Sequence, residues 1–298
     1  MKCLVTGGAG FIGSNLVDRL LDEGHEVVII DNLSTGKRKN INPQAVFYEM
    51  DITSPGAGIA FSDVDVVFHT AAKARVQPSI EDPITYNKVN IEGTLNMLKM
   101  SVDHGVKRFV YSASSSAYGN TDKMPEVETD PVNPLSPYGV QKLVGEMYCT
   151  MFPKVYDLET VSLRYFNVYG ERQSLDGAYC LVMGIFAQQR LRDTPMTING
   201  DGEQRRDFTY VGDIVDANYR AAISPNVGNG EVINIGNGDN RSVNQLADMI
   251  GGPRIHNDPV IEPACTLADN TKARELLGWE PTVKIEDWVI SYKKELGL

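Results

Sequence analysis

A glycine-rich loop near the N-terminus limits the folds that are open to this chain. Three glycines, each separated by two residues, follow a short apolar run and open a helical pattern. This spacing allows a tight turn and a close approach of the backbone to a pyrophosphate, whose charge a helix N-terminus stabilises. The loop therefore predicts a dinucleotide-binding βαβ unit. The loop residues expected at the dinucleotide are Gly7, Gly10, Phe11, Ile12 and Gly13.

The remainder of the first half alternates short apolar runs with helical patterns, which is typical of a parallel sheet covered on both faces. Helical patterns cover residues 11 to about 24 and 82–104, and a third begins after Ser136, which suits an N-cap, with Pro137 at the first helical position. The expected strands are 2–6, 26–30, 46–49, 64–69, 108–112 and 159–163.

Beyond about Asn167 the alternation weakens, although helices are still expected at 242–250 and 271–277. We therefore predict an α/β fold in two parts. Residues 1–166 are expected to form a Rossmann-type, doubly wound parallel sheet. Residues 167–298 are expected to form a smaller, mixed α/β substrate-binding domain, partly interleaved with the first.

An acidic residue at the end of the second expected strand indicates which dinucleotide binds. The carboxylate of Asp31 can accept hydrogen bonds from the hydroxyls of the adenosine ribose, and it would repel a 2′-phosphate. The sequence therefore favours NAD over NADP as cofactor. The residues expected around the adenosine are Asp31, Asn32, Ser34, Thr35, Gly36, Asp51 and Ile52.

Tyr138 and Lys142 stand four residues apart at the start of the third helical pattern, behind the serines that end the fifth strand. Positions i and i+4 share a helix face, so a phenol and an ammonium are expected to point into the same space. A nearby positive charge favours the phenolate. We therefore expect Lys142 to lower the pKa of Tyr138 towards neutrality, where a phenol can exchange protons with a substrate hydroxyl.

Composition excludes several classes of function. The net charge of −11 argues against binding nucleic acid through a broad basic surface. The four cysteines lack zinc or disulfide spacing, which suggests a reducing compartment. The sequence contains no cluster of His, Cys and carboxylate residues, so we expect no metal site. No apolar stretch approaches the length needed to span a membrane, and Met1 leads directly into a strand-like run. We expect a cytoplasmic protein.

Taken together, these features resemble the extended short-chain dehydrogenase/reductase family, and within it the nucleotide-sugar 4-epimerases. The resemblance covers almost the whole chain. Further matching segments are 69–72, 90–94, 164–170, 204–208 and 267–269. The resemblance implies NAD as cofactor, a UDP-sugar as substrate and a homodimer formed through the 82–104 helix and the Tyr138 helix.

The resemblance also implies roles for individual residues. Tyr138 would be the general acid/base, Lys142 would hold the nicotinamide ribose, Ser114 would bind the reacting hydroxyl, and Arg206 would bind the diphosphate. Further expected cofactor residues are Ala71, Ala72, Lys73, Asn90, Ser112 and Phe166. The expected substrate residues are Ser114, Ser116, Tyr138, Asn167, Val182, Thr197, Ile198, Asn199, Arg206 and Thr266.

The residues after Ser114 indicate which reaction is expected. Related sugar dehydratases carry an acidic residue there, because eliminating water needs an extra acid and base. This chain has Ser115 and Ser116, which cannot act as carboxylic acids. We therefore expect reversible oxidation at carbon 4 of the sugar, with a transient 4-keto intermediate and no net consumption of NAD.

The expected sugar depends on the size of one side chain. In the family, the position of Thr266 forms the wall beside carbon 2, and a small residue there leaves room for an N-acetyl group. We therefore expect UDP-N-acetylglucosamine and UDP-N-acetylgalactosamine to be accepted beside UDP-glucose and UDP-galactose. Pro259 and Ala264 stand where many relatives have arginines, so diphosphate binding falls more heavily on Arg206. Arg254 and His256 are nearby candidates to compensate.

Three alternatives stay open. A dehydrogenase or reductase with net redox turnover would share every cofactor residue. An epimerase or decarboxylase acting on a UDP-uronic acid would need a cation near carbon 6, and the sequence identifies none. A catalytically idle NAD-binding protein is the third, since a fold alone does not give a function.

Overall fold

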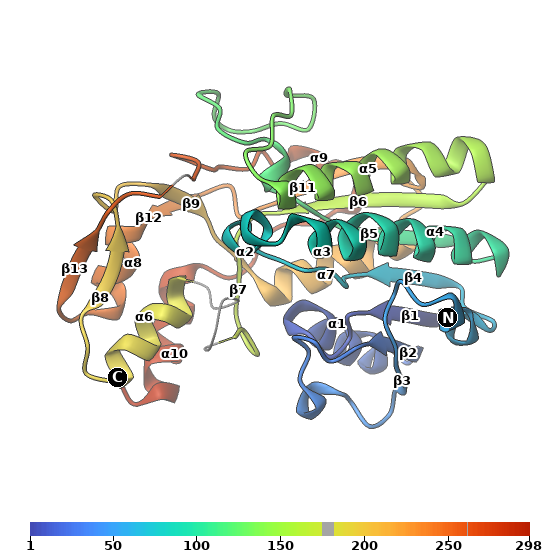
Figure 1. The fold of residues 1–298 in the computed structure, drawn as a ribbon, viewed down its shortest axis with the longest axis horizontal. Helices are drawn as coiled ribbons and strands as arrows, with labels where there is room; N and C mark the ends of the chain where they lie inside the picture. Colours follow the sequence, from blue (N-terminus) through green and yellow to red (C-terminus); the bar gives the residue numbers. More distant parts are fainter. Residues whose placement is uncertain (175–181, 261) are drawn as a thin grey trace.

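A seven-stranded parallel sheet forms the centre of the molecule, in the order β11-β6-β5-β4-β1-β2-β3 (Figure 1). This computed structural model describes residues 1–174, 182–260 and 262–298, so Cys180 lies outside the described residues. The strand order is that of the Rossmann fold, which confirms the predicted fold class. The strands are β1 Lys2–Thr6, β2 Glu26–Asp31, β3 Val46–Glu49, β4 Val66–His69, β5 Arg108–Ser114, β6 Glu159–Tyr165 and β11 Asn229–Ile235.

All six strands predicted for the first half are present. β1 and β3 have the predicted bounds, β2 continues for one further residue, β4 begins two residues later than expected, and β5 and β6 each continue for two further residues. The extension of β5 brings Ser114 to the carboxyl edge of the sheet. The seventh strand, β11, was not predicted: it begins with Asn229, Gly230 and Glu231, which are poor strand formers, and a register shift falls between Asn229 and Glu231.

Each face of the sheet is covered by helices and has its own hydrophobic core. On one face, α1 Phe11–Asp22, α7 Val211–Ile223 and α9 Thr271–Leu277 bury side chains such as Leu16, Ile214 and Leu277. On the other, the 3₁₀ segment η2 Pro55–Phe61, α4 Thr94–Asp103 and α5 Pro137–Tyr156 bury Phe61, Leu98 and Phe152. The sheet is thus doubly wound, as predicted.

The helix predicted over 82–104 is present over residues 83–103 and contains a π-helical turn. α3 Pro83–Asn87, η3 Lys88–Gly93 and α4 Thr94–Asp103 follow one another without a break, and the separate short helix α2 Val76–Glu81 precedes them. A π-turn widens the backbone by one residue, and such turns frequently occur at functional sites. Here the turn contains the buried Asn90. The remaining short 3₁₀ segments are η1 Arg38–Asn40 and η4 Ser115–Ala117.

A smaller group of elements covers the carboxyl edge of the sheet. Three two-stranded sheets pair β7 with β10, β8 with β13, and β9 with β12. Their bounds are β7 Val168–Tyr169, β8 Met196–Asn199, β9 Arg205–Asp207, β10 Thr209–Tyr210, β12 Asn240–Ser242 and β13 Arg254–Asn257. The helices are α6 Val182–Leu191, α8 Val243–Ile250 and α10 Ile285–Leu296, which share a core around Phe186, Leu246 and Trp288.

The helices predicted at 242–250 and 271–277 are confirmed as α8 and α9. The chain beyond residue 167 crosses back to the large sheet, because α7, β11 and α9 pack there. The boundary between 166 and 167 stays a prediction. No helix in the described segments has the length and apolar character needed to cross a membrane.

Candidate active site

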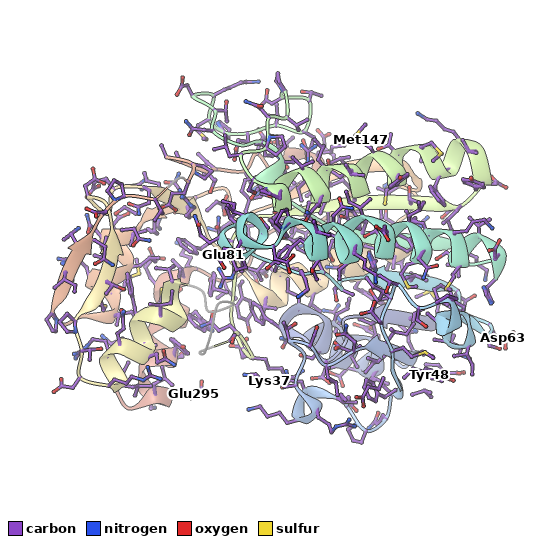
Figure 2. The ribbon with its side chains drawn as sticks, viewed as in Figure 1. Lys37, Tyr48, Asp63, Glu81, Met147 and Glu295 are labelled. Carbon is purple, nitrogen blue, oxygen red and sulfur yellow. The ribbon has the colours of Figure 1, made fainter. Side chains whose placement is uncertain are left out.

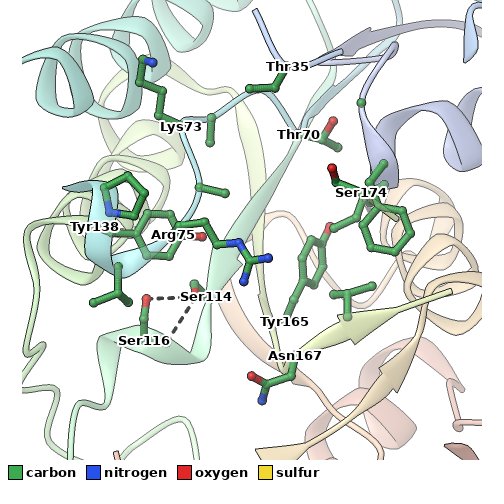
Figure 3. Close-up of a pocket in the computed structure, with 18 of the residues that line it drawn as sticks. Thr35, Thr70, Lys73, Arg75, Ser114, Ser116, Tyr138, Tyr165, Asn167 and Ser174 are labelled. Carbon is green, nitrogen blue, oxygen red and sulfur yellow. Dashed lines mark hydrogen bonds between the residues drawn. The ribbon is translucent and has the colours of Figure 1, made fainter. Parts of the chain in front are cut away.

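A cleft of about 1300 Å³ lies at the carboxyl ends of the sheet strands, where the smaller group of elements meets the sheet. Figure 3 shows part of its lining, to which Tyr138 and Ser114 contribute from one side and Tyr165 and Asn167 from the other. Open α/β sheets bind ligands at this edge. The cleft exceeds the roughly 300–1,000 Å³ of a pocket for one drug-sized ligand, so it has room for a dinucleotide and a second molecule.

The glycine loop forms a close-fitting cradle at one end of the cleft. Gly7 has φ +72°, and a Cβ atom added there would meet the backbone N of Ala71 at 2.8 Å. A Cβ at Gly13 would lie 2.3 Å from the carbonyl oxygen of Gly7, so only glycine lets α1 approach the loop this closely. All five predicted loop residues line the cleft. This cradle fits the pyrophosphate of a dinucleotide.

Asp31 lies beside this cradle and is almost fully buried. Its carboxylate accepts hydrogen bonds from the backbone N–H of Ala9 at 3.0 Å and of Leu33 at 2.8 Å. Burial raises the pKa of Asp31, and these two bonds oppose the rise. Each carboxylate oxygen keeps further acceptor capacity, so the geometry suits the two hydroxyls of a ribose.

The residues predicted around the adenosine mostly line the same end of the cleft, and Gly36 is the exception. The carboxylate of Asp51 accepts from Asn32 at 2.8 Å and from Thr53. Burial raises the pKa of Asp51, but these hydrogen bonds outweigh it and lower the pKa overall. Gly36 lies behind Asp31, where a Cβ would meet its oxygen at 2.7 Å. The predicted residues that line the cleft here are Asp31, Asn32, Ser34, Thr35, Asp51 and Ile52.

The segment after β4 continues the wall of the cleft. Ala71, Ala72 and Lys73 line it, whereas Asn90 does not. Asn90 instead holds the segment in place, because its amide exchanges hydrogen bonds with the backbone of Lys73 at 2.8 and 2.9 Å. The ammonium of Lys73 lies 5.6 Å from the ring centre of Tyr86, a cation–π contact.

Ser114, Ser116 and Tyr138 meet at the middle of the cleft. The hydroxyl of Ser116 donates to that of Ser114 at 2.9 Å, and Ser114 acts on the phenol of Tyr138 so as to lower its pKa. Ser136 caps α5 by accepting from the backbone N–H of Gly139 at 3.1 Å, as its sequence position predicted. This cap fixes the first turn of the helix and therefore the direction of the Tyr138 side chain.

The predicted lowering of the Tyr138 pKa by Lys142 is wrong. Burial raises the pKa of Tyr138 above its ordinary value, and the opposing contributions come from the hydrogen bond to Ser114 and the charge of Arg75. Lys142 does not line the cleft. Its ammonium donates to the backbone carbonyl of Ser112 at 2.7 Å, and burial lowers its own pKa to about 8. The prediction that Tyr138 and Lys142 share a helix face was correct, but the Lys142 ammonium binds the backbone carbonyl of Ser112.

Two further predicted cofactor residues lie behind the surface of the cleft. Ser112 is buried, and its hydroxyl forms a 3.0 Å hydrogen bond with the phenol of Tyr165. Phe166 is fully buried against Tyr118 and Ala268. Both therefore support residues that reach the cleft, and neither lines it.

The opposite side of the cleft is formed by the smaller group of elements. The hydroxyl of Thr266 accepts from the amide of Asn167 at 3.3 Å and from the backbone N–H of Asp207 at 3.2 Å. Arg206 forms an ion pair with Glu262 at 2.5 Å. All of these except Asp207 line the cleft, as do Val182, Thr197 and Asn199. Ile198 points into the core and does not.

Arg254 and His256 do not compensate for the missing arginines. Arg254 forms an ion pair with Asp248 at 2.8 Å, and the imidazole of His256 bonds the carbonyl oxygen of Gly200 at 2.8 Å. Both lie on β13, and neither lines the cleft. In the described segments, no group of three His, Cys, Asp or Glu side chains is arranged to hold a metal ion.

Several residues that the sequence did not single out also line the cleft. Arg75, Tyr165 and Glu262 are the chemically important ones. Tyr165 belongs to a matching family segment and could have been found there. Arg75 and Glu262 stand in loops without a recognisable pattern, so only the tertiary structure places them at the site.

Comparison with known proteins agrees with this site. A model of the NAD dependent epimerase/dehydratase family matches residues 3–236. A relative from Methanocaldococcus jannaschii, described as a putative UDP-glucose 4-epimerase, is 41% identical, and the match covers 96% of this chain and 95% of that protein.

Two solved structures share the fold over nearly the whole chain. UDP-glucose 4-epimerase from Thermotoga maritima, solved with UDP-glucose, is 40% identical with a TM-score of 0.93, covering 99% of this chain and 100% of that one. UDP-glucuronic acid 4-epimerase from Bacillus cereus, solved with UDP-glucuronic acid and NAD, is 35% identical with a TM-score of 0.91, covering 100% and 99%. The similar proteins thus act on different sugars.

Proposed function

The chain belongs to the NAD-dependent epimerase/dehydratase family, and we propose that it epimerises carbon 4 of UDP-hexoses such as UDP-glucose and UDP-galactose. Family membership makes it an NAD-dependent enzyme of the UDP-sugar 4-epimerase type. The sugar that it prefers is the part that we infer. The observation that carries the proposal is the meeting of Ser114, Ser116 and Tyr138 in one cleft with the glycine cradle.

Tyr138 moves the proton in this proposal. Its phenolate takes the proton of the 4-hydroxyl, and its phenol returns the proton after the sugar ring has rotated in the site. Ser114 holds the same hydroxyl at hydrogen-bond distance, and Ser116 orients Ser114. NAD, which the glycine cradle and Asp31 would hold, would supply the reversible hydride transfer at carbon 4. The pKa of Tyr138 is raised in the structure, so the cations around it have to favour the phenolate for turnover.

The serines after β5 also support epimerisation over dehydration. Ser115 and Ser116 form the 3₁₀ turn η4 where the related dehydratases have acidic residues. A hydroxyl can donate or accept a hydrogen bond but cannot supply the extra acid and base that expulsion of water requires.

Thr266 supports acceptance of N-acetylhexosamines. Its side chain is short and only 6% exposed, and it is held in the wall by Asn167 and Asp207. A wall built from a small, fixed side chain leaves volume beside the sugar. UDP-N-acetylglucosamine and UDP-N-acetylgalactosamine are therefore further proposed substrates, with Arg206 at their diphosphate.

We also propose a homodimer through the 82–104 helix, which comprises α3, η3 and α4, and through α5, which packs against it at the front of the molecule (Figure 1). Large apolar side chains are exposed on these helices, namely Ile84 at 82% on α3 and Met147 at 63% on α5. Met147 is labelled in Figure 2. Exposed apolar patches of this kind mark interfaces. Met147→Asp should convert the dimer to a monomer in light scattering, and a wild-type monomer would contradict the proposal.

The experiment that tests the function uses the full chain loaded with NAD. Wild-type protein should convert UDP-glucose to an equilibrium mixture with UDP-galactose, detected by chromatography, without net NADH absorbance at 340 nm. Tyr138→Phe should reduce turnover by about two to four orders of magnitude while NAD content and melting temperature stay near those of the wild type. Stoichiometric NADH formation would instead show a dehydrogenase.

A further inference from the structure

Arg75 has an unusual backbone conformation at the edge of the active site. It is the residue before α2, with φ +93° and ψ +140°. This combination lies outside the left-handed helical region and close to the region that only glycine adopts at low cost. A side chain held in such a conformation at a ligand cleft points to a functional constraint, because glycine would fit the same backbone without strain.

The side chain of Arg75 reaches the reaction centre. It lines the cleft, and Figure 3 shows its guanidinium projecting into the pocket, towards the space between Ser114 and Tyr165. Its charge acts on the phenol of Tyr138 and lowers the pKa of that group. Since Tyr138 and Ser114 are the proposed partners of the 4-hydroxyl, the guanidinium lies where the sugar ring is expected.

A guanidinium recognises carboxylates and phosphates through paired hydrogen bonds. Both phosphate-bearing parts of the ligands are already assigned to other binding residues. The dinucleotide pyrophosphate fits the glycine cradle, and the diphosphate of the substrate is assigned to Arg206, on the other side of the cleft. Among the anionic groups that the ligands can carry, a carboxylate on the sugar ring is the one not yet assigned to a residue.

We propose that Arg75 binds a carboxylate carried by the sugar ring, so that the site also accepts a UDP-hexuronic acid. This inference rests on the proposed 4-epimerisation and leaves its chemistry unchanged. The proton of the 4-hydroxyl passes to Tyr138 and returns, the hydride leaves and re-enters carbon 4, and no bond to the carboxylate forms or breaks. Arg75 is thus the cation near carbon 6 that the sequence did not reveal.

The test compares UDP-glucuronic acid with UDP-glucose for NAD-loaded wild type, Arg75→Met, Arg75→Lys and Arg192→Met. Arg192 is exposed and does not line the cleft, so its variant removes the same charge elsewhere. Wild type should epimerise both sugars. Arg75→Met should lower kcat/KM for UDP-glucuronic acid at least about tenfold relative to UDP-glucose. Arg75→Lys should retain part of the preference, and Arg192→Met should keep the wild-type ratio.

Two results would overturn the inference. One is a wild type that epimerises UDP-glucose but not UDP-glucuronic acid. The other is an Arg75→Met variant that loses both activities equally, which would place the guanidinium on the diphosphate or the reacting hydroxyl. If wild type turned over neither sugar, the proposed function itself would fail.

A glycine variant separates binding from folding. Arg75→Gly relieves the backbone conformation, so it should melt at or above the wild-type temperature. It should nevertheless lose the uronate activity to the same extent as Arg75→Met. A lower melting temperature, or retained uronate activity, would contradict a guanidinium held in place for binding.

Discussion

Removing the carboxylate of Glu262 should tighten the binding of UDP. In the structure, Arg206 donates to Glu262 at 2.5 Å, and Gln204 donates to the same carboxylate at 3.2 Å. If Arg206 binds the diphosphate, as we propose, the ligand must first displace Glu262 from the guanidinium. Glu262 also lines the cleft, so its negative charge opposes the approach of a diphosphate. Glu262→Gln removes both penalties while keeping a side chain of the same size.

The size of the effect follows from the exposure of the two side chains. A hydrogen bond to a charged group contributes about 1.5–3 kcal/mol when it is well shielded. Here the Arg206 side chain is 12% exposed and that of Glu262 is 34% exposed, so solvent weakens the pair. A contribution of about 1–2 kcal/mol is therefore reasonable. At 25 °C this corresponds to UDP binding that is about 5- to 30-fold tighter in the variant.

Isothermal titration of NAD-loaded protein with UDP measures this difference directly. Glu203→Gln is the matched control. Glu203 is an exposed carboxylate three residues before Arg206 in the sequence, and it binds Asn244 instead of Arg206. The control should keep the wild-type affinity. The gain in Glu262→Gln should shrink at 1 M salt, where the Debye length falls to about 3 Å. Unchanged or weaker UDP binding at low salt would refute the reasoning.

Two further predictions concern the wall of the cleft and a buried carboxyl. Thr266→Tyr should remove activity on UDP-N-acetylglucosamine at least about tenfold more than activity on UDP-glucose, because the phenol fills the space beside the sugar; equal losses in steady-state kinetics would contradict the steric role. Burial, with a further contribution from Asp207, raises the pKa of Glu126 from 4.5 to about 7. The folded state then binds this proton more tightly than the unfolded chain, so this group's contribution to the unfolding free energy is lost as the pH rises from about 4.5 to about 7. Glu126→Gln should therefore gain on the order of 2 kcal/mol relative to wild type between pH 5 and pH 8 in urea denaturation; a constant difference would show that Glu126 does not titrate in this range.

Local sequence patterns predicted much of the fold because they depend on interactions between residues that are close in the sequence. The apolar runs became strands, and Ser136 with Pro137 began α5, since capping and proline geometry depend only on neighbouring residues. β11 escaped prediction because its place beside β6 comes from a contact far along the chain. The π-helical turn inside the 82–104 helix was likewise not predicted; it contains Asn90, whose amide bonds the backbone of Lys73, far from it in the sequence.

The sequence by itself determined the glycine cradle, the carboxylate of Asp31 at the end of β2, and the placing of Ser114 and Tyr138 at the ends of neighbouring elements, because each depends on a local motif. Only the tertiary structure decided the electrostatics. It turned Lys142 towards Ser112, paired Arg206 with Glu262 and brought Arg75 to Tyr138. Charges act through space, and the distances between them depend on how loops from separate elements meet at one edge of the sheet.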